Sequence, residues 1–224
     1  MKYIALLITM GFFASCSTIP VITSPSLSSA QKNLICPSPF LKEKSQLIHA
    51  IEINAAGNVQ GAILGVTVVD PFTRFVSCAI MTAEGMVLLE AQSNGEKLII
   101  NRALPPFDSG DFAKNLIDDI RLIYFNPQGL LQKNGNLPDG ATACRWQEEN
   151  GNFIDVIAGK LESAEIKKYS ESGSLKRHIK LTQRDGNPYS IIELQGREMV
   201  DYTLLMTLIE AQTAEGKLPG KILR

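Results

Sequence analysis

Glycine-containing turn signals divide most of this chain into short apolar runs, and they constrain its fold more than any other feature. The signals are Ala56-Gly57-Asn58, Glu84-Gly85, Asn94-Gly95, Asn150-Gly151, Ser172-Gly173, Asp185-Gly186 and Gln195-Gly196. Asn-Gly and Asp-Gly pairs tolerate the positive φ values of tight hairpin turns, and the runs between the turns are rich in Val, Ile, Leu, Phe and Tyr. This spacing predicts an antiparallel meander in which each strand pairs with the next one along the chain.

The apolar runs predict about eleven strands in two groups, separated by one amphipathic helix. The predicted strands are residues 47–54, 58–69, 73–82, 86–93, 96–102, 143–149, 152–159, 162–169, 174–184, 187–194 and 197–209. The predicted helix covers about residues 110–125, where apolar residues recur at spacings of three and four. It ends near Asn126-Pro127, because the residue before a proline disfavours the helical region.

A sheet of this length must curl, and an apolar helix inserted midway can fill its concave face. We therefore predict a mainly β chain of the α+β class: an antiparallel, incompletely closed β-barrel of about eleven strands with an inserted helical plug. Asp118 and Asp119 lie in the helix and point about 100° apart. We expect one of them to face solvent and the other to orient the helix through an ion pair or a backbone amide.

The composition offers little for catalysis or for nucleic-acid binding. The net charge is −1 and no basic run is present, which argues against a nucleic-acid partner. His49 and His178 lie on distant predicted strands, and no nucleophile elbow, zinc-protease motif or phosphate loop accompanies them. We therefore expect a protein that is not an enzyme, with no catalytic residue, no cofactor and no metal site.

Three cysteines follow Cys16, and their spacing fits no metal site. At most one disulfide can form among Cys36, Cys78 and Cys144. Cys78 lies within an apolar, strand-like run, which favours a bond between Cys36 and Cys144. Three free or buried thiols remain an equally open alternative.

The first sixteen residues resemble the signal sequence and lipobox of bacterial lipoproteins. Lys2 supplies a positive start, residues 3–13 form an uncharged apolar run, and Ala14-Ser15 places small residues before Cys16. The resemblance implies a signal peptide at residues 1–15 and a lipidated Cys16 at the start of the mature chain, and Ser17 then favours the outer membrane. The alternatives are an ordinary secretory signal and an uncleaved anchor, although the apolar run is shorter than the ~20 residues that span a bilayer.

The remaining boundaries follow from composition. Residues 16–45 are rich in Ser, Thr and Pro and show no sustained periodicity, so we predict a lipidated N-terminus followed by a flexible linker. Residues 46–212 form the predicted folded domain, and residues 213–224 form a C-terminal tail.

A lipobox, a meander of about eleven strands and a helix between two sets of strands resemble the outer-membrane lipoprotein receptor LolB and its soluble carrier LolA. The amino-acid sequence of one segment is closer still to a group of LolB-like lipoproteins, some of which are associated with aryl-polyene lipid synthesis. The residues that carry this resemblance are Phe75-Val76-Ser77-Cys78-Ala79-Ile80, Glu84-Gly85, Asn94-Gly95, Leu104-Pro105-Pro106 and the helix from Asn115 to the aromatic pair Tyr124-Phe125.

The resemblance implies a cavity for acyl chains between the helix and the concave face of the sheet, although a filled core is an equal alternative. The residues expected to line it are Val66, Val68, Phe75, Ile80, Met81, Leu88, Ile99, Phe112, Leu116, Ile117, Ile120, Ile123 and Met206. The receptor also inserts an exposed apolar residue into the membrane, and Phe72 is the candidate for that contact. The carrier also has a buried arginine near its early strands. This sequence has no equivalent, because residues 45–69 contain no arginine, and Arg74 and Arg102 are only candidate substitutes.

The leading hypothesis is an outer-membrane lipoprotein that binds the acyl chains of a lipid, a lipid-linked compound or a lipoprotein for transfer or insertion at the membrane. Its expected partners are membrane lipid through the Cys16 anchor, the acyl-chain or lipoprotein cargo, and a periplasmic carrier. The alternative is a structural or assembly lipoprotein that docks another envelope protein and carries no lipid.

Overall fold

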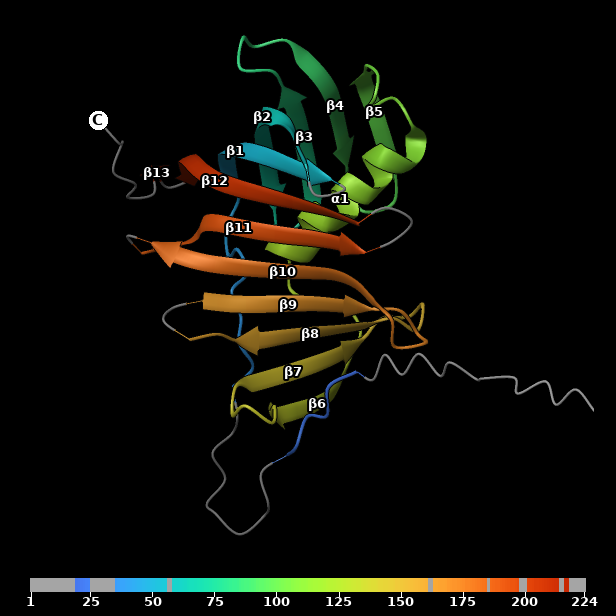
Figure 1. Ribbon diagram of the computed structural model, residues 1–224, viewed down its shortest axis with the longest axis vertical. Helices are drawn as coiled ribbons and strands as arrows, with labels where there is room; N and C mark the ends of the chain where they lie inside the picture. The colour runs from blue at the N-terminus through green and yellow to red at the C-terminus, as the bar shows by residue number, and fades with distance from the viewer. Residues whose placement is uncertain are drawn as a thin grey trace, which may run out of the picture.

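The computed structural model describes residues 19–24, 35–55, 58–160, 163–184, 186–197, 201–213 and 216–217. These residues form one long antiparallel sheet that bends around a single helix (Figure 1). The elements are β1 (Ser45–Ala55), β2 (Asn58–Asp70), β3 (Phe75–Met81), β4 (Val87–Ser93), β5 (Leu98–Ala103), α1 (Gly110–Tyr124), β6 (Leu130–Asn136), β7 (Thr142–Gln147), β8 (Phe153–Ala158), β9 (Ser163–Tyr169), β10 (Leu175–Arg184), β11 (Asn187–Arg197), β12 (Asp201–Thr213) and β13 (Gly216–Lys217).

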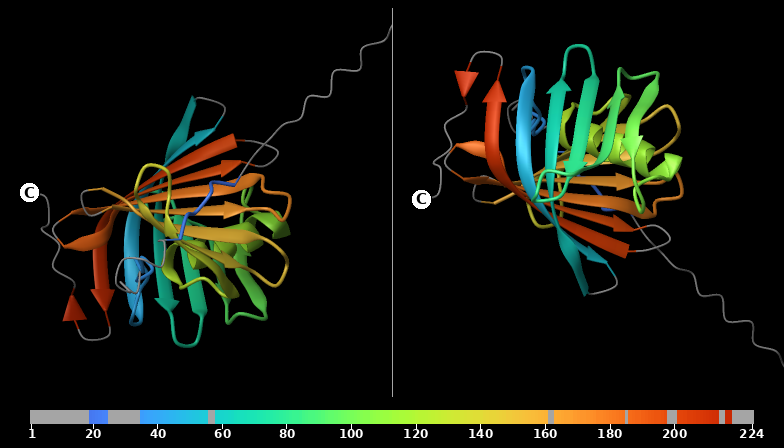
Figure 2. Two further views of the ribbon diagram at one scale, coloured as in Figure 1. Left: turned by 90° about the horizontal axis from the view of Figure 1, so that it is seen from below. Right: turned by 90° about the horizontal axis from the view of Figure 1, so that it is seen from above.

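The strand order shows an incompletely closed barrel. It runs β5-β4-β3-β2-β1-β12-β11-β10-β9-β8-β7-β6, with the short β13 paired to β12. Pairing of β1 with β12 joins the two groups of strands, whereas β5 and β6 remain as the two edges of the sheet. Strands β2–β5 run in a clearly different direction from β6–β11, and α1 lies on the concave side between them (Figures 1 and 2). The predicted fold class, an open antiparallel barrel with a helical insert, is confirmed.

One hydrophobic core connects the helix to both halves of the sheet. In β3, Val76, Cys78 and Ile80 are buried and alternate with partly exposed residues, as expected for a strand with one face against a core. The same cluster contains Ile117 from α1 and Leu194 from β11. The helix therefore fills the concave face of the sheet.

Polar contacts fix the start and the orientation of the helix. Ser109 caps its first turn, since the Ser109 hydroxyl accepts a 3.2 Å hydrogen bond from the Phe112 N–H. Asp118 is exposed, whereas the Asp119 carboxylate accepts bonds from Arg177 Nε at 2.7 Å and from Tyr202 Oη at 3.1 Å. The expectation of one solvent-facing and one orienting aspartate is confirmed.

The structure contains two strands that were not predicted from the sequence, β6 and β13. β6 (Leu130–Asn136) reads LLQKNGN, with no alternation of apolar and polar residues, and most of its side chains are exposed at the sheet edge. The short β13 lies within the predicted C-terminal tail. The strand predicted at 197–209 is found at Asp201–Thr213, four residues later than expected.

The flexible linker predicted for residues 16–45 is wrong for two segments, the first of which is residues 19–24. Ile22 is 4% exposed and packs in a small apolar cluster with Ala143. Thr23 pairs with Asn136 of β6 through two backbone bonds of 2.9 and 3.0 Å. Burial of an isoleucine and pairing with an unfilled strand edge hold this segment on the sheet.

The second packed segment is residues 35–44. Phe40 and Leu41 are buried in the main core, and the Leu41 N–H donates a 3.1 Å bond to the Tyr124 carbonyl at the end of α1. The proposed signal peptide and Cys16 lie outside the described residues. Within the described part of the chain, no helix is long and apolar enough to cross a membrane.

Candidate functional site

A sizeable cavity lies beneath residues 37–43, which we call the strap. Its volume is about 510 Å³, within the range of about 300–1,000 Å³ that is usual for ligand pockets. The strap forms one wall, and the ends of β8–β12 form the other, with mostly apolar surface. The lining residues are Pro37, Ser38, Pro39, Phe40, Leu41, Lys42, Glu43, Ser45, Ala158, Ser163, Ala164, Leu181, Gln183, Gly186, Asn187, Tyr189 and Thr213.

Tyr189 connects the strap to the helix beside this cavity. Its hydroxyl donates a 2.6 Å hydrogen bond to the Pro39 carbonyl. Its ring meets the Tyr124 ring edge-to-face, with centroids 5.1 Å apart, a favoured aromatic geometry. Burial raises the pKa of both tyrosines above the ordinary value. Both phenols are therefore neutral near pH 7, and Tyr189 acts as a hydrogen-bond donor.

His49 lies on β1, where it forms a hydrogen bond to the backbone of Tyr189. Burial lowers the pKa of His49 from 6.5 to about 4, and the Tyr189 bond opposes this shift only in part. Its Nε2 is buried and has no hydrogen-bond partner among the described residues. His178 lies on β10, 2.9 Å from the Glu165 carboxylate.

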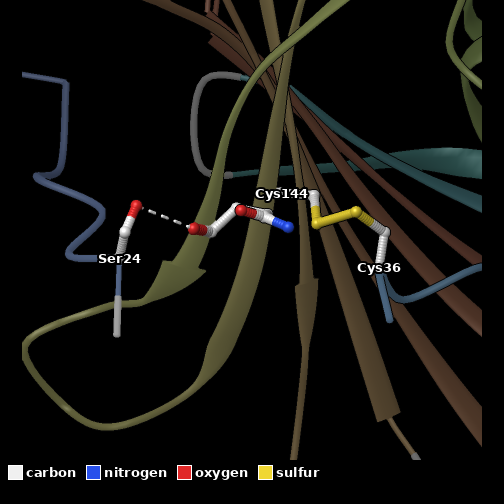
Figure 3. Close-up of a disulfide and its surroundings, with 4 residues drawn as sticks. Ser24, Cys36 and Cys144 are labelled. Atoms are coloured by element: carbon white, nitrogen blue, oxygen red, sulfur yellow. Dashed lines mark hydrogen bonds between the residues drawn. A yellow bond between two sulfur atoms is a disulfide. The ribbon is translucent and has the colours of Figure 1, made fainter. Parts of the chain in front are cut away.

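A disulfide fixes the start of the strap to β7. The Sγ atoms of Cys36 and Cys144 lie 2.01 Å apart (Figure 3), and this is the pair that the sequence favoured. The Ser24 hydroxyl donates a 3.2 Å bond to the Asn134 carbonyl on the neighbouring β6 (Figure 3). Cys78 is a buried free cysteine, and burial raises the pKa of its thiol to about 12, so it is unreactive near neutral pH.

None of the thirteen residues predicted to line an acyl cavity lines the cavity beneath the strap. Five of the thirteen are buried in the core around the helix: Ile80, Ile117, Ile120, Ile123 and Met206. Three more pack against this core: Leu88, Phe112 and Leu116. Ile99 is 40% exposed on the edge strand β5. The concave face under the helix is thus occupied by packed side chains.

The other four predicted lining residues require a correction. Val66, Val68, Phe75 and Met81 are only partly buried and alternate with residues that face the core. Side chains in a strand point to opposite faces in turn, so these four lie on the outer face of the sheet. The prediction selected apolar residues without separating the two faces.

Sequence reasoning missed the strap because its prolines and serines are typical of a linker. One signal was present, since Phe40-Leu41 is an apolar pair four residues after a cysteine. A large apolar pair close to a disulfide cysteine indicates a segment that packs on the domain.

Three further predicted positions are exposed or partly exposed. Phe72 is 81% exposed at the turn between β2 and β3, where the Asp70 carboxylate accepts a 2.9 Å bond from its backbone N–H. Its membrane contact stays a prediction. Arg74 lies 4.9 Å from the centroid of the Phe125 ring, and Arg102 is exposed on β5.

The sequence matches no protein-family model and no curated protein. Among solved structures, a LolA superfamily protein of Nitrosomonas europaea is similar, with a TM-score of 0.50 and 14% sequence identity. The alignment covers 81% of this chain and 89% of that protein. The chain has a LolA-like fold. At 14% identity the similarity concerns the fold alone. In this chain, the cavity of about 510 Å³ lies between the sheet and the strap.

Proposed function

We propose that this chain is a non-enzymatic lipoprotein that binds an acyl chain, from a lipid, a lipid-linked compound or another lipoprotein, in the cavity beneath the strap. The observation that carries the proposal is the mostly apolar cavity of about 510 Å³. The LolA-like fold supports it, because the related structure belongs to a superfamily named after a lipoprotein carrier. Transfer or insertion at the membrane, with a periplasmic carrier as partner, completes the proposed role.

The chemistry of the lining suits an acyl chain. Apolar burial contributes about 0.8 kcal/mol per CH₂ group and needs no directional bond. Phe40, Leu41 and Leu181 supply apolar walls, while Lys42 and Gln183 offer polar groups to a chain's carboxyl or ester end. Association costs of about 4 kcal/mol or more oppose this gain, and micromolar binding needs a net gain of about 8 kcal/mol, so a chain must bury about fifteen CH₂ groups.

Filling the cavity tests the proposal. Ala158 lines the cavity at the end of β8, and Ala158→Phe places a ring in the space meant for the ligand. We expect at least tenfold weaker binding of a fluorescent fatty acid, which corresponds to about 1.4 kcal/mol. Ala62→Phe, on an exposed position of β2, is the matched control and should leave the affinity unchanged. Equal binding by all three proteins, or no bound lipid by mass spectrometry, contradicts the proposal.

We further propose that Cys16 carries the lipid anchor and holds the protein at the outer membrane. The lipobox-like sequence before Cys16 supports this. Several acyl chains on one residue give a stable attachment, whereas a single chain gives a marginal one. The full chain should incorporate radioactive palmitate and sediment with outer membranes, and Cys16→Ser should abolish both. Palmitate incorporation that survives this substitution refutes the assignment.

A second candidate function is an assembly lipoprotein that docks another envelope protein. Both edge strands favour it, because β5 exposes Ile99 and Ile100, and β6 exposes Leu130 and Leu131 at the end away from its pairing with Thr23. Unpaired strand edges with apolar side chains are templates for strand addition. Crosslinking in cells separates the two roles: one stoichiometric protein partner attached at β5 or β6, without bound lipid, favours assembly.

A further inference from the structure

A second, smaller pocket lies at the other end of β8 and β9, beside the last turns of α1. Its volume is about 230 Å³. Ile154 and Lys168 line it, whereas the opposite ends of the same two strands line the apolar cavity. Arg74 reaches it from the turn between β2 and β3, and Arg121 reaches it from the helix.

Positive charge exceeds negative charge in this pocket. Arg74, Arg121 and Lys168 line it together with two carboxylates, those of Asp118 and Glu148. Lys168 Nζ is paired with the Glu148 carboxylate at 2.9 Å. Arg121 Nη1 lies 3.6 Å from the Asp118 carboxylate, at long range for an ion pair. Among the residues that the structure describes, no carboxylate pairs with Arg74. The pocket therefore holds one cation in excess.

Hydrogen-bond donors in the pocket are also incompletely used. Arg121 Nη2 donates a 2.7 Å bond to the Ser93 hydroxyl, but Arg121 Nε is buried and has no partner in the described part of the chain. A buried donor without an acceptor costs about 1–3 kcal/mol. An oxygen-rich anion supplies the missing acceptors.

Arg74 is held in an unusual conformation beside this site. Its φ is +55°, and it is the one non-glycine residue with a positive φ in the described part of the chain. Its guanidinium stacks 4.9 Å from the Phe125 ring centroid. Burial and the nearby positive charge of Arg121 lower the pKa of Arg74. Two guanidinium groups that repel each other, one of them in a costly backbone conformation, indicate a site prepared for an anion.

We propose that this pocket binds a phosphate group, with Arg74 and Arg121 donating hydrogen bonds to its oxygens. The planar guanidinium matches phosphate geometry with two parallel N–H groups. The pocket is smaller than the usual ligand pocket of about 300 Å³ or more, so it suits one small anionic group. The phosphate is either a free ion or the headgroup of a phospholipid. The inference is independent of the acyl-chain proposal, because no residue of the strap cavity takes part.

Titration of the purified full chain with inorganic phosphate, against chloride at equal ionic strength, tests the free ion. Arg74→Gln should weaken phosphate binding at least tenfold. Arg102→Gln removes an exposed arginine outside the pocket and should change the affinity less than twofold. Arg74→Gly removes the guanidinium and relieves the positive φ, so it should keep or raise the thermal midpoint while losing phosphate affinity. A variant that loses phosphate affinity but keeps its thermal midpoint has lost a ligand contact and not its fold.

Co-flotation of the Cys16→Ser chain, which lacks the proposed lipid anchor, with phosphatidylcholine vesicles that do or do not contain phosphatidic acid tests the headgroup. Binding of inorganic phosphate that depends on Arg74 supports the site with a free ion as ligand. Binding to vesicles that contain phosphatidic acid, without binding of inorganic phosphate, supports the site with a lipid headgroup as ligand. This binding should also be lost in Arg74→Gln and Arg74→Gly. Absence of both, or binding that is equal in the Arg74 and Arg102 variants, overturns the proposal.

Discussion

At the scale of single residues, burial determines the chemistry of His49 and Cys78. His49 forms one hydrogen bond, to the Tyr189 backbone, and leaves its second nitrogen buried without a partner among the described residues. Cys78 faces the core between β2 and β4. Both side chains are in their neutral forms near pH 7, as structural residues of the sheet interior.

The buried His49 should make the protein less stable as the pH falls. The pKa of His49 is lowered from 6.5 to about 4 in the folded chain, so between these pH values the unfolded chain binds a proton that the folded chain does not. The free energy of unfolding should therefore fall by about 3 kcal/mol between pH 7 and pH 4. Urea unfolding at several pH values measures this, and His49→Leu should remove that part of the slope.

Ile51→Leu is the control for this experiment, because Ile51 lies on the same strand as His49, packs against the core and does not titrate. It should retain the pH dependence of the unsubstituted chain. A His49→Leu profile parallel to that of the unsubstituted chain contradicts the assignment.

Some residue roles could be predicted and others could not. The different roles of Asp118, which faces solvent, and Asp119, which orients the helix, could be predicted from helical geometry, because adjacent residues point in different directions. The outward placement of Val66 and Val68 did not follow from apolarity, since a one-residue change in strand register moves a side chain to the other face. The Arg74 pocket brings together the turn between β2 and β3, the helix α1 and the strand β9, and this meeting of distant segments has no local sequence signal.

At the scale of elements, the strap shows how a segment with linker composition becomes part of a fold. Phe40 and Leu41 bury apolar side chains, and Tyr189 and Tyr124 satisfy two of its backbone groups. The helix could be predicted because its apolar stripe has a clear period. The strap and β6 could not, because one has no period and the other is a polar edge strand.

Removal of the strap disulfide should destabilise the chain. The bond joins residues separated by 108 positions, and closing so long a loop restricts the unfolded chain strongly. Cys36→Ser with Cys144→Ser should lower the free energy of unfolding by about 2–4 kcal/mol, measured by urea titration. Cys78→Ala, which removes a buried free thiol, should cost less. A double variant as stable as the parent shows that the bond carries no stabilising constraint.

At the scale of the whole molecule, the two groups of strands share one core and should unfold together. The cluster around α1 includes residues from β3 and β4 on one side and from β8–β11 on the other. Leu89 of β4 is fully buried in this cluster. The single tryptophan, Trp146, lies on β7 in the other half and packs against the same cluster, so it reports on the distant side.

Leu89→Ala should therefore shift the unfolding transition seen at Trp146. Truncation of a buried leucine costs about 2–5 kcal/mol, and the urea midpoints from tryptophan fluorescence and far-ultraviolet circular dichroism should move together. Met86→Ala, at an exposed position, should leave both midpoints nearly unchanged. A fluorescence transition unaffected by Leu89→Ala shows that the halves unfold separately.

The bond between Cys36 and Cys144 also determines how mechanical force travels through the molecule. Cys36 is joined to β7 immediately before the strap begins to wall the cavity. Tension applied to the chain ahead of residue 19 first meets the pairing of Thr23 with β6. Once that pairing opens, the tension passes through Cys36 into β7 and its hydrogen bonds to β6 and β8. Residues 37–43 lie beyond this junction, so the disulfide offers the load a path into the sheet that bypasses the roof of the cavity.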